Sequence, residues 1–311
     1  MAERNNKFPK GILGFPVTPF RERRYVDFPA LERNIEFLID EKVSAVFVAC
    51  GAGEFQSITE EEYCNMVELA VKTAKGRVPV YTGVGGNIEL ALDHAKVSEE
   101  LGADGYLILP PYLIDGEQEG MYQYYETIIS STSLNAIMYQ RNNAVANLDT
   151  VTKLAELPQL VGLKDGVGNM ELNIELTQHL GNRLEWMNGM PLAEVTMQAY
   201  YPLGFDSYSS AISNYIPHIS RLYFDSLVKG DTKQVNALYK EVILPINEIR
   251  KQKKGYAVSL IKAGMDIVGF PVGQSVRPPV IPVETEHYQQ LKKIINKALE
   301  KYPKEEHQGL V

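Results

Sequence analysis

The sequence is short of cysteine, of surplus positive charge and of long apolar runs, and each shortage excludes a class of protein. Its two cysteines, Cys50 and Cys64, are too few for a disulfide framework or a four-thiolate zinc site. The 31 Lys and Arg residues are outnumbered by 39 Asp and Glu, so the net charge of −8 leaves no cationic excess to neutralise nucleic-acid or lipid phosphates. We expect a small-molecule partner, with no nucleic acid and no membrane.

Signals that direct a chain into or across a membrane are also missing from the pattern. Residues 1–10 are polar and charged, whereas a signal peptide has an apolar core. No run reaches the roughly eighteen apolar residues that a membrane helix needs. Together with the few cysteines, which suit a reducing compartment, these features predict a cytoplasmic protein.

Nucleotide-binding and metal-binding motifs are absent as well. Neither residues 83–86 nor residues 166–168 complete the G-x-G-x-x-G pattern, and no Gly-Lys dipeptide exists for a phosphate-binding loop. No two of the five histidines stand at metal-ligand spacing: His94, His179, His218, His287 and His307. The sequence therefore predicts no metal and no cofactor.

What the sequence does contain is a recurring pair of patterns. Eight short apolar, β-branched runs begin at residues 11, 45, 78, 105, 135, 160, 184 and 206, at spacings of 22 to 34 residues. Such runs are typical of parallel strands buried on both faces. The segments between them have helical periodicity, and Thr59 and Glu62 have the spacing of a capping box. Eight such units predict an α/β fold, a (β/α)8 TIM barrel, which typically takes about 250 residues.

The last part of the chain shows helical patterns only. One apolar stripe spans residues 235–246, with a kink expected at Pro245, and another spans residues 288–299. We therefore expect a catalytic barrel at residues 9–228 and a C-terminal helical extension packed on it at residues 229–303. A basic run at residues 250–254 is interpreted as the cationic last turn of a helix, with a phosphate-binding patch as the alternative.

One lysine stands where a barrel of this type places its chemistry, at the C-terminal end of a strand. Lys164 ends the sixth apolar run. Desolvation there would lower the lysine pKa from about 10.4 toward roughly 7 to 8 and produce an amine able to form a Schiff base with a ketone. The alternative is a lysine that pairs with Asp165 or extends into solvent.

Two other strand ends carry polar groups that would suit the same site. Tyr139 and Arg141 end the fifth run; the phenol can relay protons and the guanidinium can bind a carboxylate, although a tyrosine in an apolar strand is often a core residue. The second run ends in a glycine-rich turn at residues 51–53. Its backbone amides either bind an anion, or the glycines only allow a tight turn between strand and helix. Cys50 before it is either a reactive thiol or a small packed residue.

Six short motifs spread over the chain identify a family. As a set they resemble the Schiff-base lyases of the dihydrodipicolinate synthase and N-acetylneuraminate lyase superfamily, which are class I aldolases, and within it the 5-dehydro-4-deoxyglucarate dehydratases. The similarity runs from about Pro9 to Pro303. The motifs are GFPVT at residues 14–18, GEF at 53–55, QEG at 118–120, GLKDGVG at 162–168, YSSA at 208–211 and KGYAVS at 254–259.

The resemblance assigns roles to residues of this sequence. It implies that Lys164 is the Schiff-base lysine and that Tyr139 shuttles protons at the imine. It also implies that Tyr112 reaches into a neighbouring subunit's site. The remaining positions that it implies are substrate-binding: Gly51, Ala52 and Gly53 for the carboxylate next to the ketone, and Asn188, Gly189, Ser209 and Ser210 for the substrate chain.

Two positions depart from the pattern of the superfamily. Ala52 stands where a hydroxyl residue is usual, so carboxylate binding there would rest on backbone amides, without a hydroxyl relay to Tyr139. Ala144 stands where the synthases carry an arginine for a distal carboxylate, which argues against dihydrodipicolinate synthesis. Arg141 matches the dehydratase pattern instead and would bind a second carboxylate bidentately.

The resemblance implies a decarboxylating dehydratase of sugar-diacid (glucarate) catabolism. Its substrate would be 5-dehydro-4-deoxy-D-glucarate, converted through a lysine Schiff base to 2,5-dioxopentanoate (2-oxoglutarate semialdehyde), water and carbon dioxide, without a cofactor. It also implies a homo-oligomer, a dimer or a tetramer. Two alternatives stay open: a class I aldolase that cleaves a 2-keto-3-deoxy sugar acid, and, because of Ala52, a catalytically silent sugar-acid binding protein.

Overall fold

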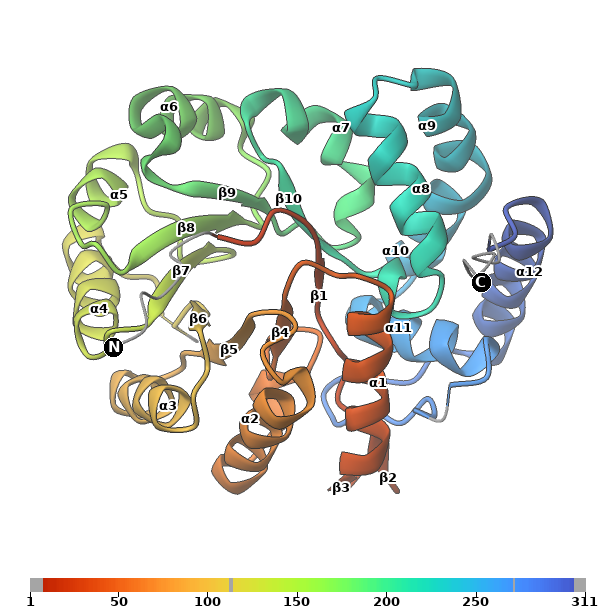
Figure 1. Ribbon diagram of the computed structural model, residues 1–311, viewed down its shortest axis with the longest axis horizontal. Helices are drawn as coiled ribbons and strands as arrows, with labels where there is room; N and C mark the ends of the chain where they lie inside the picture. Colours follow the sequence, from red (N-terminus) through yellow and green to blue (C-terminus); the bar gives the residue numbers. More distant parts are fainter. Residues whose placement is uncertain (1–7, 112–113, 271, 305–311) are drawn as a thin grey trace, which may run out of the picture.

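Eight parallel strands form a closed barrel at the centre of the molecule (Figure 1). The computed structural model describes residues 8–111, 114–270 and 272–304. Around the barrel the strand order is β1-β10-β9-β8-β7-β6-β5-β4. This confirms the predicted TIM barrel, and every strand begins within two residues of the predicted position. The strands are β1 (Gly11–Gly14), β4 (Val46–Val48), β5 (Val80–Val84), β6 (Gly105–Ile108), β7 (Asn135–Gln140), β8 (Leu160–Asp165), β9 (Glu185–Asn188) and β10 (Ser207–Ser210).

The barrel interior is filled by side chains from neighbouring strands. The Phe15 and Phe47 rings stack with centroids 4.5 Å apart, and the Phe47 and Tyr81 rings stack at 4.9 Å. All three rings are buried. Since strand residues on both faces are buried, the runs are nearly continuous in apolar residues, as the sequence indicated.

Helices alternate with the strands and surround the barrel (Figure 1). The predicted capping box is present: the Thr59 hydroxyl accepts from the Glu62 amide, and the Glu62 carboxylate accepts from the Thr59 amide. The helices are α1 (Phe28–Asp40), α2 (Glu60–Ala74), α3 (Ile88–Glu100), α4 (Gln118–Ser130), α5 (Leu148–Leu154), α6 (Met170–Leu180), α7 (Met197–Tyr200) and α8 (Pro217–Val228). Short 3-10 turns are η1 (Phe55–Ser57), η2 (Gly181–Arg183), η3 (Ala193–Val195), η4 (Tyr201–Leu203) and η5 (Ile212–Asn214).

A small hairpin that the sequence analysis missed precedes α1. Its strands, β2 (Phe20–Arg21) and β3 (Tyr25–Val26), pair antiparallel. Glu22 and Arg23 between them both have left-handed backbones, with φ of 52° and 58°. Consecutive left-handed residues match the twist of a tight hairpin. Strands of two residues are too short to show an alternating pattern, so no sequence signal marks them.

In the described residues after α8, four helices and a π-helical turn gather along one side of the barrel, beside α8 and α1 (Figure 1). The kink expected at Pro245 takes the form of the π-helical turn, which ends just before it, because proline has no N–H for the regular ladder. The predicted stripes are largely buried, with Leu238, Ile243 and Ile295 fully so. The elements are α9 (Thr232–Leu238), η6 (Tyr239–Ile243), α10 (Leu244–Lys251), α11 (Tyr256–Ile267) and α12 (Thr285–Lys301).

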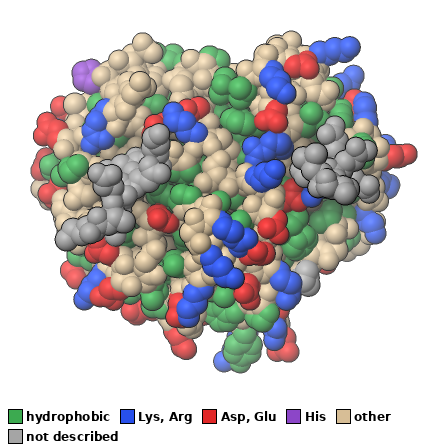
Figure 2. Space-filling model, in the orientation of Figure 1, with side chains coloured by type: hydrophobic (Ala, Val, Ile, Leu, Met, Phe, Trp, Pro, Cys, Tyr) green, Lys and Arg blue, Asp and Glu red, His purple; other side chains and the backbone are tan. Residues whose placement is uncertain are grey.

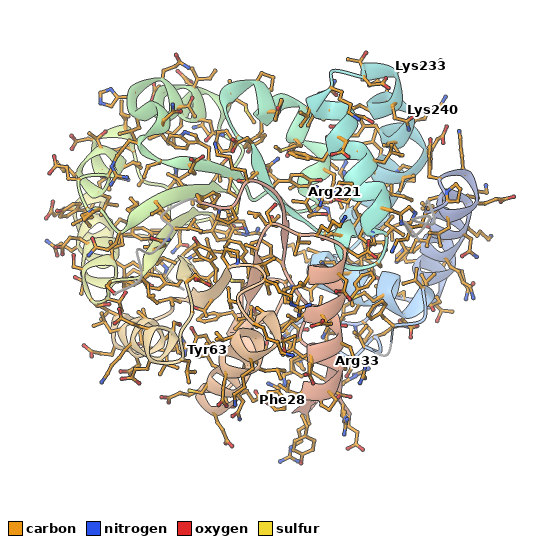
Figure 3. All side chains as sticks on the ribbon, viewed as in Figure 1. Phe28, Arg33, Tyr63, Arg221, Lys233 and Lys240 are labelled. Atoms are coloured by element: carbon orange, nitrogen blue, oxygen red, sulfur yellow. The ribbon has the colours of Figure 1, made fainter. Side chains whose placement is uncertain are left out.

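Charged side chains of both signs are scattered over the face seen in Figure 2. Figure 3 shows Lys233 and Lys240 at the periphery of the extension, directed away from the barrel strands. Over the described segments, no helix is both long and apolar enough to cross a membrane. Because both charge signs are scattered over this face, the surface alone does not indicate which Lys or Arg side chains bind a substrate; their position in the fold does.

Candidate active site

A cavity of about 300 Å³ lies at the C-terminal ends of the barrel strands. It brings together eight of the residues singled out in the sequence: Gly51, Ala52, Tyr139, Arg141, Lys164, Gly189, Ser209 and Ser210. A larger and more open groove, of about 830 Å³, runs between η3, α7 and α10 and contains none of them. The strand-end cavity is therefore the candidate active site.

Lys164 is almost completely buried, with 6% of its surface exposed. Its Nζ lies 4.2 Å from the centre of the Tyr139 ring and 4.4 Å from the centre of the Phe15 ring. Burial is the main cause that lowers the pKa of Lys164, and the positive charge of Arg141 lowers it further, against opposing effects of Tyr139 and Cys50. Lys164 makes no ion pair with any residue that the structure describes. These surroundings favour the neutral, nucleophilic amine.

Asp165, the alternative partner of Lys164, faces the outer layer instead. Its carboxylate accepts hydrogen bonds from the Tyr200 hydroxyl at 2.5 Å, from Asn173 at 2.8 Å and from the Val167 amide at 2.9 Å. Successive residues of a strand point to opposite faces, so a carboxylate turned toward the helices leaves Lys164 turned toward the cavity. The pairing alternative does not occur in this structure.

The stem of Lys164 needs a glycine on the neighbouring strand end. A Cβ at Gly189 would lie 2.5 Å from Cε and from Cγ of Lys164. Both contacts are closer than real Cβ atoms tolerate, so either the side chain or the backbone would have to move. The packing of the Lys164 side chain therefore requires a residue without a Cβ at position 189.

Tyr139 is held in place by two hydrogen bonds. Arg141 Nη1 donates to the phenol oxygen at 2.9 Å, and the phenol donates to the Gly189 carbonyl oxygen at 3.2 Å. On β7 and β8, Tyr139 stands directly opposite Lys164. The phenol is therefore oriented without a hydroxyl from position 52, and the guanidinium places a positive charge beside the lysine.

The turn after β4 has the features of an anion-binding site. Gly51 and Ala52 line the cavity, and the amides of residues 51–53 donate no hydrogen bond to other described residues. Ala49 before the turn has a left-handed backbone, with φ of 53°. Gly83 on β5 accommodates it, because a Cβ there would collide with the Ala49 carbonyl oxygen. Free amides at the rim suit a substrate carboxylate.

Some predicted residues lie outside the cavity. Gly53 is buried behind the rim, where its carbonyl oxygen accepts from the Thr18 hydroxyl at 2.6 Å. The Asn188 side chain faces the outer layer and donates to the Ala193 carbonyl oxygen and the Thr196 hydroxyl. Asn188 is the last residue of β9, and Gly189, which follows it directly, lines the cavity. Tyr112 lies outside the described residues.

The hydroxyls of Ser209 and Ser210 lie on opposite faces of β10, because successive side chains of a strand alternate. The Ser209 hydroxyl donates to the Asn188 carbonyl oxygen at 3.5 Å, at the cavity side. The Ser210 hydroxyl donates to the Glu194 carboxylate at 2.5 Å in the outer layer, so Ser210 lines the cavity through other atoms. Burial raises the pKa of Glu194 to about 7.

The sequence analysis missed the contribution of the extension to the cavity wall. Ala257, Val258 and Ile261 of α11 line it. The motif at residues 254–259 marked this segment, but helical periodicity alone does not reveal which face covers a distant strand end. The extension thus forms part of the candidate site.

A buried ion pair that was also missed joins the extension to the turn after β4. Lys262 Nζ of α11 donates to Glu54 Oε1 at 2.6 Å, and both side chains are fully buried. The other Glu54 oxygen accepts from the Arg277 amide at 2.9 Å. Both cations lie against the Phe20 ring, with Lys262 Nζ 4.5 Å and the Arg277 guanidinium carbon 4.2 Å from its centre. The partners are more than 200 residues apart, so no local pattern links them.

Cys50 is a packed residue in this structure. It is fully buried, and its thiol donates to the Val48 carbonyl oxygen at 3.5 Å. Burial raises the pKa of the thiol to about 12. Within the part of the chain that the structure describes, His, Cys, Asp and Glu side chains form no group of three or more that could hold a metal ion.

Comparisons with known proteins agree with this geometry. A dihydrodipicolinate synthase from Oceanobacillus iheyensis superposes with a TM-score of 0.87 at 24% identity, covering 94% of this chain and 97% of that one. One from Aquifex aeolicus superposes with a TM-score of 0.84 at 26% identity, covering 95% and 99%. The first likeness concerns the fold alone.

Two relatives are much more similar in sequence. Proteins named probable 5-dehydro-4-deoxyglucarate dehydratase are 63% identical in Oceanobacillus iheyensis, covering 96% of this chain and 97% of the relative, and 62% identical in Bacillus subtilis, covering 97% and 98%. The model of the dihydrodipicolinate synthetase family matches residues 8–298. With its closed barrel and its lysine-centred cavity, the chain belongs to the dihydrodipicolinate synthetase family.

Proposed function

We propose that the protein is a decarboxylating dehydratase that converts 5-dehydro-4-deoxy-D-glucarate to 2,5-dioxopentanoate, water and carbon dioxide. The observation that carries the proposal is the desolvated Lys164 amine facing the cavity between two aromatic rings. The names of relatives at 62–63% identity support the choice of substrate. The residue roles below are part of the proposal.

The first stage of the reaction forms the iminium. The carboxylate next to the ketone binds the free amides of Gly51 and Ala52, which brings the ketone to Lys164 Nζ. The amine attacks the ketone carbon and water leaves. The resulting cationic C=N bond withdraws electrons from the neighbouring methylene, whose proton becomes acidic.

The second stage removes water and then carbon dioxide. The Tyr139 phenol, or a water that it orders, carries the methylene proton to the β-hydroxyl. The hydroxyl then leaves as water, and the C=C bond that forms is conjugated with the iminium. The distal carboxylate then leaves as carbon dioxide, and its bonding electron pair moves through the conjugated system to nitrogen. Protonation of carbon, tautomerisation of the enol to an aldehyde and hydrolysis release 2,5-dioxopentanoate and return Lys164.

Borohydride trapping tests the proposal. The protein is incubated with the keto diacid and borohydride, and the reduced adduct is located by peptide mass spectrometry. We expect the adduct on Lys164, together with release of one carbon dioxide per turnover. Pyruvate and an aldehyde in place of carbon dioxide would indicate an aldolase of the same superfamily.

A matched lysine controls for nonspecific reaction. Lys72 is exposed on α2 and should carry no adduct. Lys164→Ala should abolish both trapping and turnover. If the folded wild-type protein gives no adduct on Lys164, both the dehydratase and the aldolase are excluded, and a sugar-acid binding protein remains. Full turnover by Lys164→Ala would also refute the mechanism.

We also propose that residues 9–228 and 229–303 are the barrel and its extension, and that the protein is a cytoplasmic homo-oligomer. The end of α8 at Val228 supports the boundary, and the free thiols Cys50 and Cys64 suit a reducing compartment. Light scattering after size-exclusion chromatography measures the assembly. A mass of about 35 kDa, that of one chain, would refute the homo-oligomer.

A further inference from the structure

We propose that Arg250 of the extension joins Arg141 to bind the second carboxylate of the substrate and so selects diacids. This inference rests on the proposed function and adds a specificity-determining residue to it. Arg250 belongs to the basic run at residues 250–254, which the proposed reaction leaves without a role.

Arg250 differs from the rest of its run in burial. It is part-buried at the end of α10, whereas residues 251–254 are exposed. Lys251 pairs with Glu248 at 3.0 Å, and Lys253 pairs with Glu284 at 2.7 Å. An inward-facing guanidinium in an otherwise solvated run indicates a role inside the fold.

The inward side of Arg250 lies next to the candidate active site. Arg250 lines a small cavity of about 20 Å³. Four other residues of its wall also line the cavity that contains Lys164: Leu192, Ala211, Ala257 and Ile261. These four shared residues make the two spaces neighbours, with Ala257 and Ile261 of α11 on the wall of both.

The positive charge of Arg141 acts on the Arg250 guanidinium. Burial is the main cause that lowers the pKa of Arg250, and the charge of Arg141 lowers it further, with only Glu248 opposing. Within the described residues neither guanidinium forms an ion pair: Arg141 donates to the Tyr139 phenol, and Arg250 Nε donates to Asn247 Oδ1 at 2.9 Å. Two like charges that are partly withdrawn from water are stabilised when an anion lies between them.

The chemistry of the substrate supplies that anion. One carboxylate of the diacid binds the amides of Gly51 and Ala52, and the other extends away from Lys164. Planar guanidinium groups bind carboxylates through two parallel hydrogen bonds, so an arginine pair distinguishes a carboxylate from a neutral hydroxymethyl group.

The same contact makes a kinetic prediction. The distal carboxylate loses its negative charge as carbon dioxide forms, so the arginine contact is stronger in the bound substrate than in the decarboxylation transition state. Removing it should weaken binding without slowing a rate-limiting decarboxylation. A merely structural arginine would lower kcat for every substrate.

The experiment compares the diacid with the monoacid that has a hydroxymethyl group in place of the distal carboxylate. The concentration that half-saturates borohydride trapping at Lys164 is measured for both, and KM and kcat are measured for the diacid. In Arg250→Gln we expect the half-saturating concentration and KM of the diacid to rise at least tenfold. The monoacid value should change less than threefold and kcat should not fall.

Two variants control the experiment. Arg250→Lys keeps the charge and should recover part of the diacid affinity. Lys251→Gln removes an exposed cation from the same run and should leave the half-saturating concentration of both substrates unchanged. Equal weakening of both substrates by Arg250→Gln, or no weakening of the diacid, would overturn the inference. A wild-type protein that forms no adduct would instead overturn the proposed function, and the inference with it.

Discussion

Removing one partner of the buried Glu54–Lys262 pair should cost far more stability than removing one partner of an exposed pair at the same distance. Glu54→Gln leaves the Lys262 ammonium fully buried beside a neutral amide, with the Ser275 carbonyl oxygen at 2.6 Å as its other acceptor. Breaking a buried pair in this way costs about 3–5 kcal/mol, because the remaining charge is uncompensated. The free energy of unfolding should fall by that amount in guanidinium titrations followed by Trp186 fluorescence.

An exposed pair at the same distance provides the control. Lys72 and Glu68 on α2 also lie 2.6 Å apart, but 69% and 49% of their side-chain surfaces are exposed. Glu68→Gln should cost less than about 1 kcal/mol. The double variant Glu54→Gln, Lys262→Met removes both charges and should lose less stability than the sum of its single changes. A loss for Glu54→Gln as small as that of the exposed control would refute the reasoning.

Further predictions concern the lysine, the phenol and a buried carboxyl. Gly189→Ala should reduce borohydride trapping at Lys164 at least tenfold, because the added Cβ would lie 2.5 Å from the lysine stem. Tyr139→Phe should lower kcat by about 10²- to 10⁴-fold, the usual contribution of a proton-transfer group, while trapping at Lys164 persists. The pKa of Glu194, about 7 in the folded state, lies above its ordinary 4.5, so the folded protein is stabilised at low pH and loses this stabilisation as the pH rises through 7. The loss is on the order of 3 kcal/mol in the wild-type protein and absent in Glu194→Gln, as measured by unfolding free energies at pH 5 and pH 8.

The Gly189 and Glu194 variants each have a matched control. Gly120→Ala on α4 adds a Cβ into open space and should leave trapping unchanged. Glu100→Gln removes an exposed carboxylate and should keep the wild-type pH dependence. Unchanged trapping in Gly189→Ala, unchanged kcat in Tyr139→Phe, or a wild-type pH dependence in Glu194→Gln would contradict the corresponding prediction.

The barrel was predictable because its signals are local. Each buried parallel strand is a short run of residues, mostly apolar, and some helix starts carry a local capping signal, as at Thr59 and Glu62. The strand-end position of Lys164 follows from the same pattern. The hairpin of β2 and β3 was not predictable, since two-residue strands carry no periodicity.

The parts of the site that were not predictable depend on long-range geometry. Asn188 and Gly189 are adjacent in sequence, and only the register of β9 decides which of them reaches the cavity. Glu54 and Lys262 pair across more than 200 residues. The partial burial of Arg250 depends on how α10 packs. In the sequence, Arg250 is one of several adjacent basic residues, and the pattern does not distinguish it from the exposed ones. Such contacts join residues that are distant in sequence, so they can be identified only from the folded structure.

The protonated thiol of Cys50 has a consequence for chemical selectivity. A thiolate beside a ketone would add to it and form a hemithioketal, in competition with the amine of Lys164. A pKa of about 12 keeps this thiol protonated near neutral pH, and a protonated thiol is a poor nucleophile. The same protonation makes the Cys50 thiol itself a poor target for peroxide and for alkylating reagents.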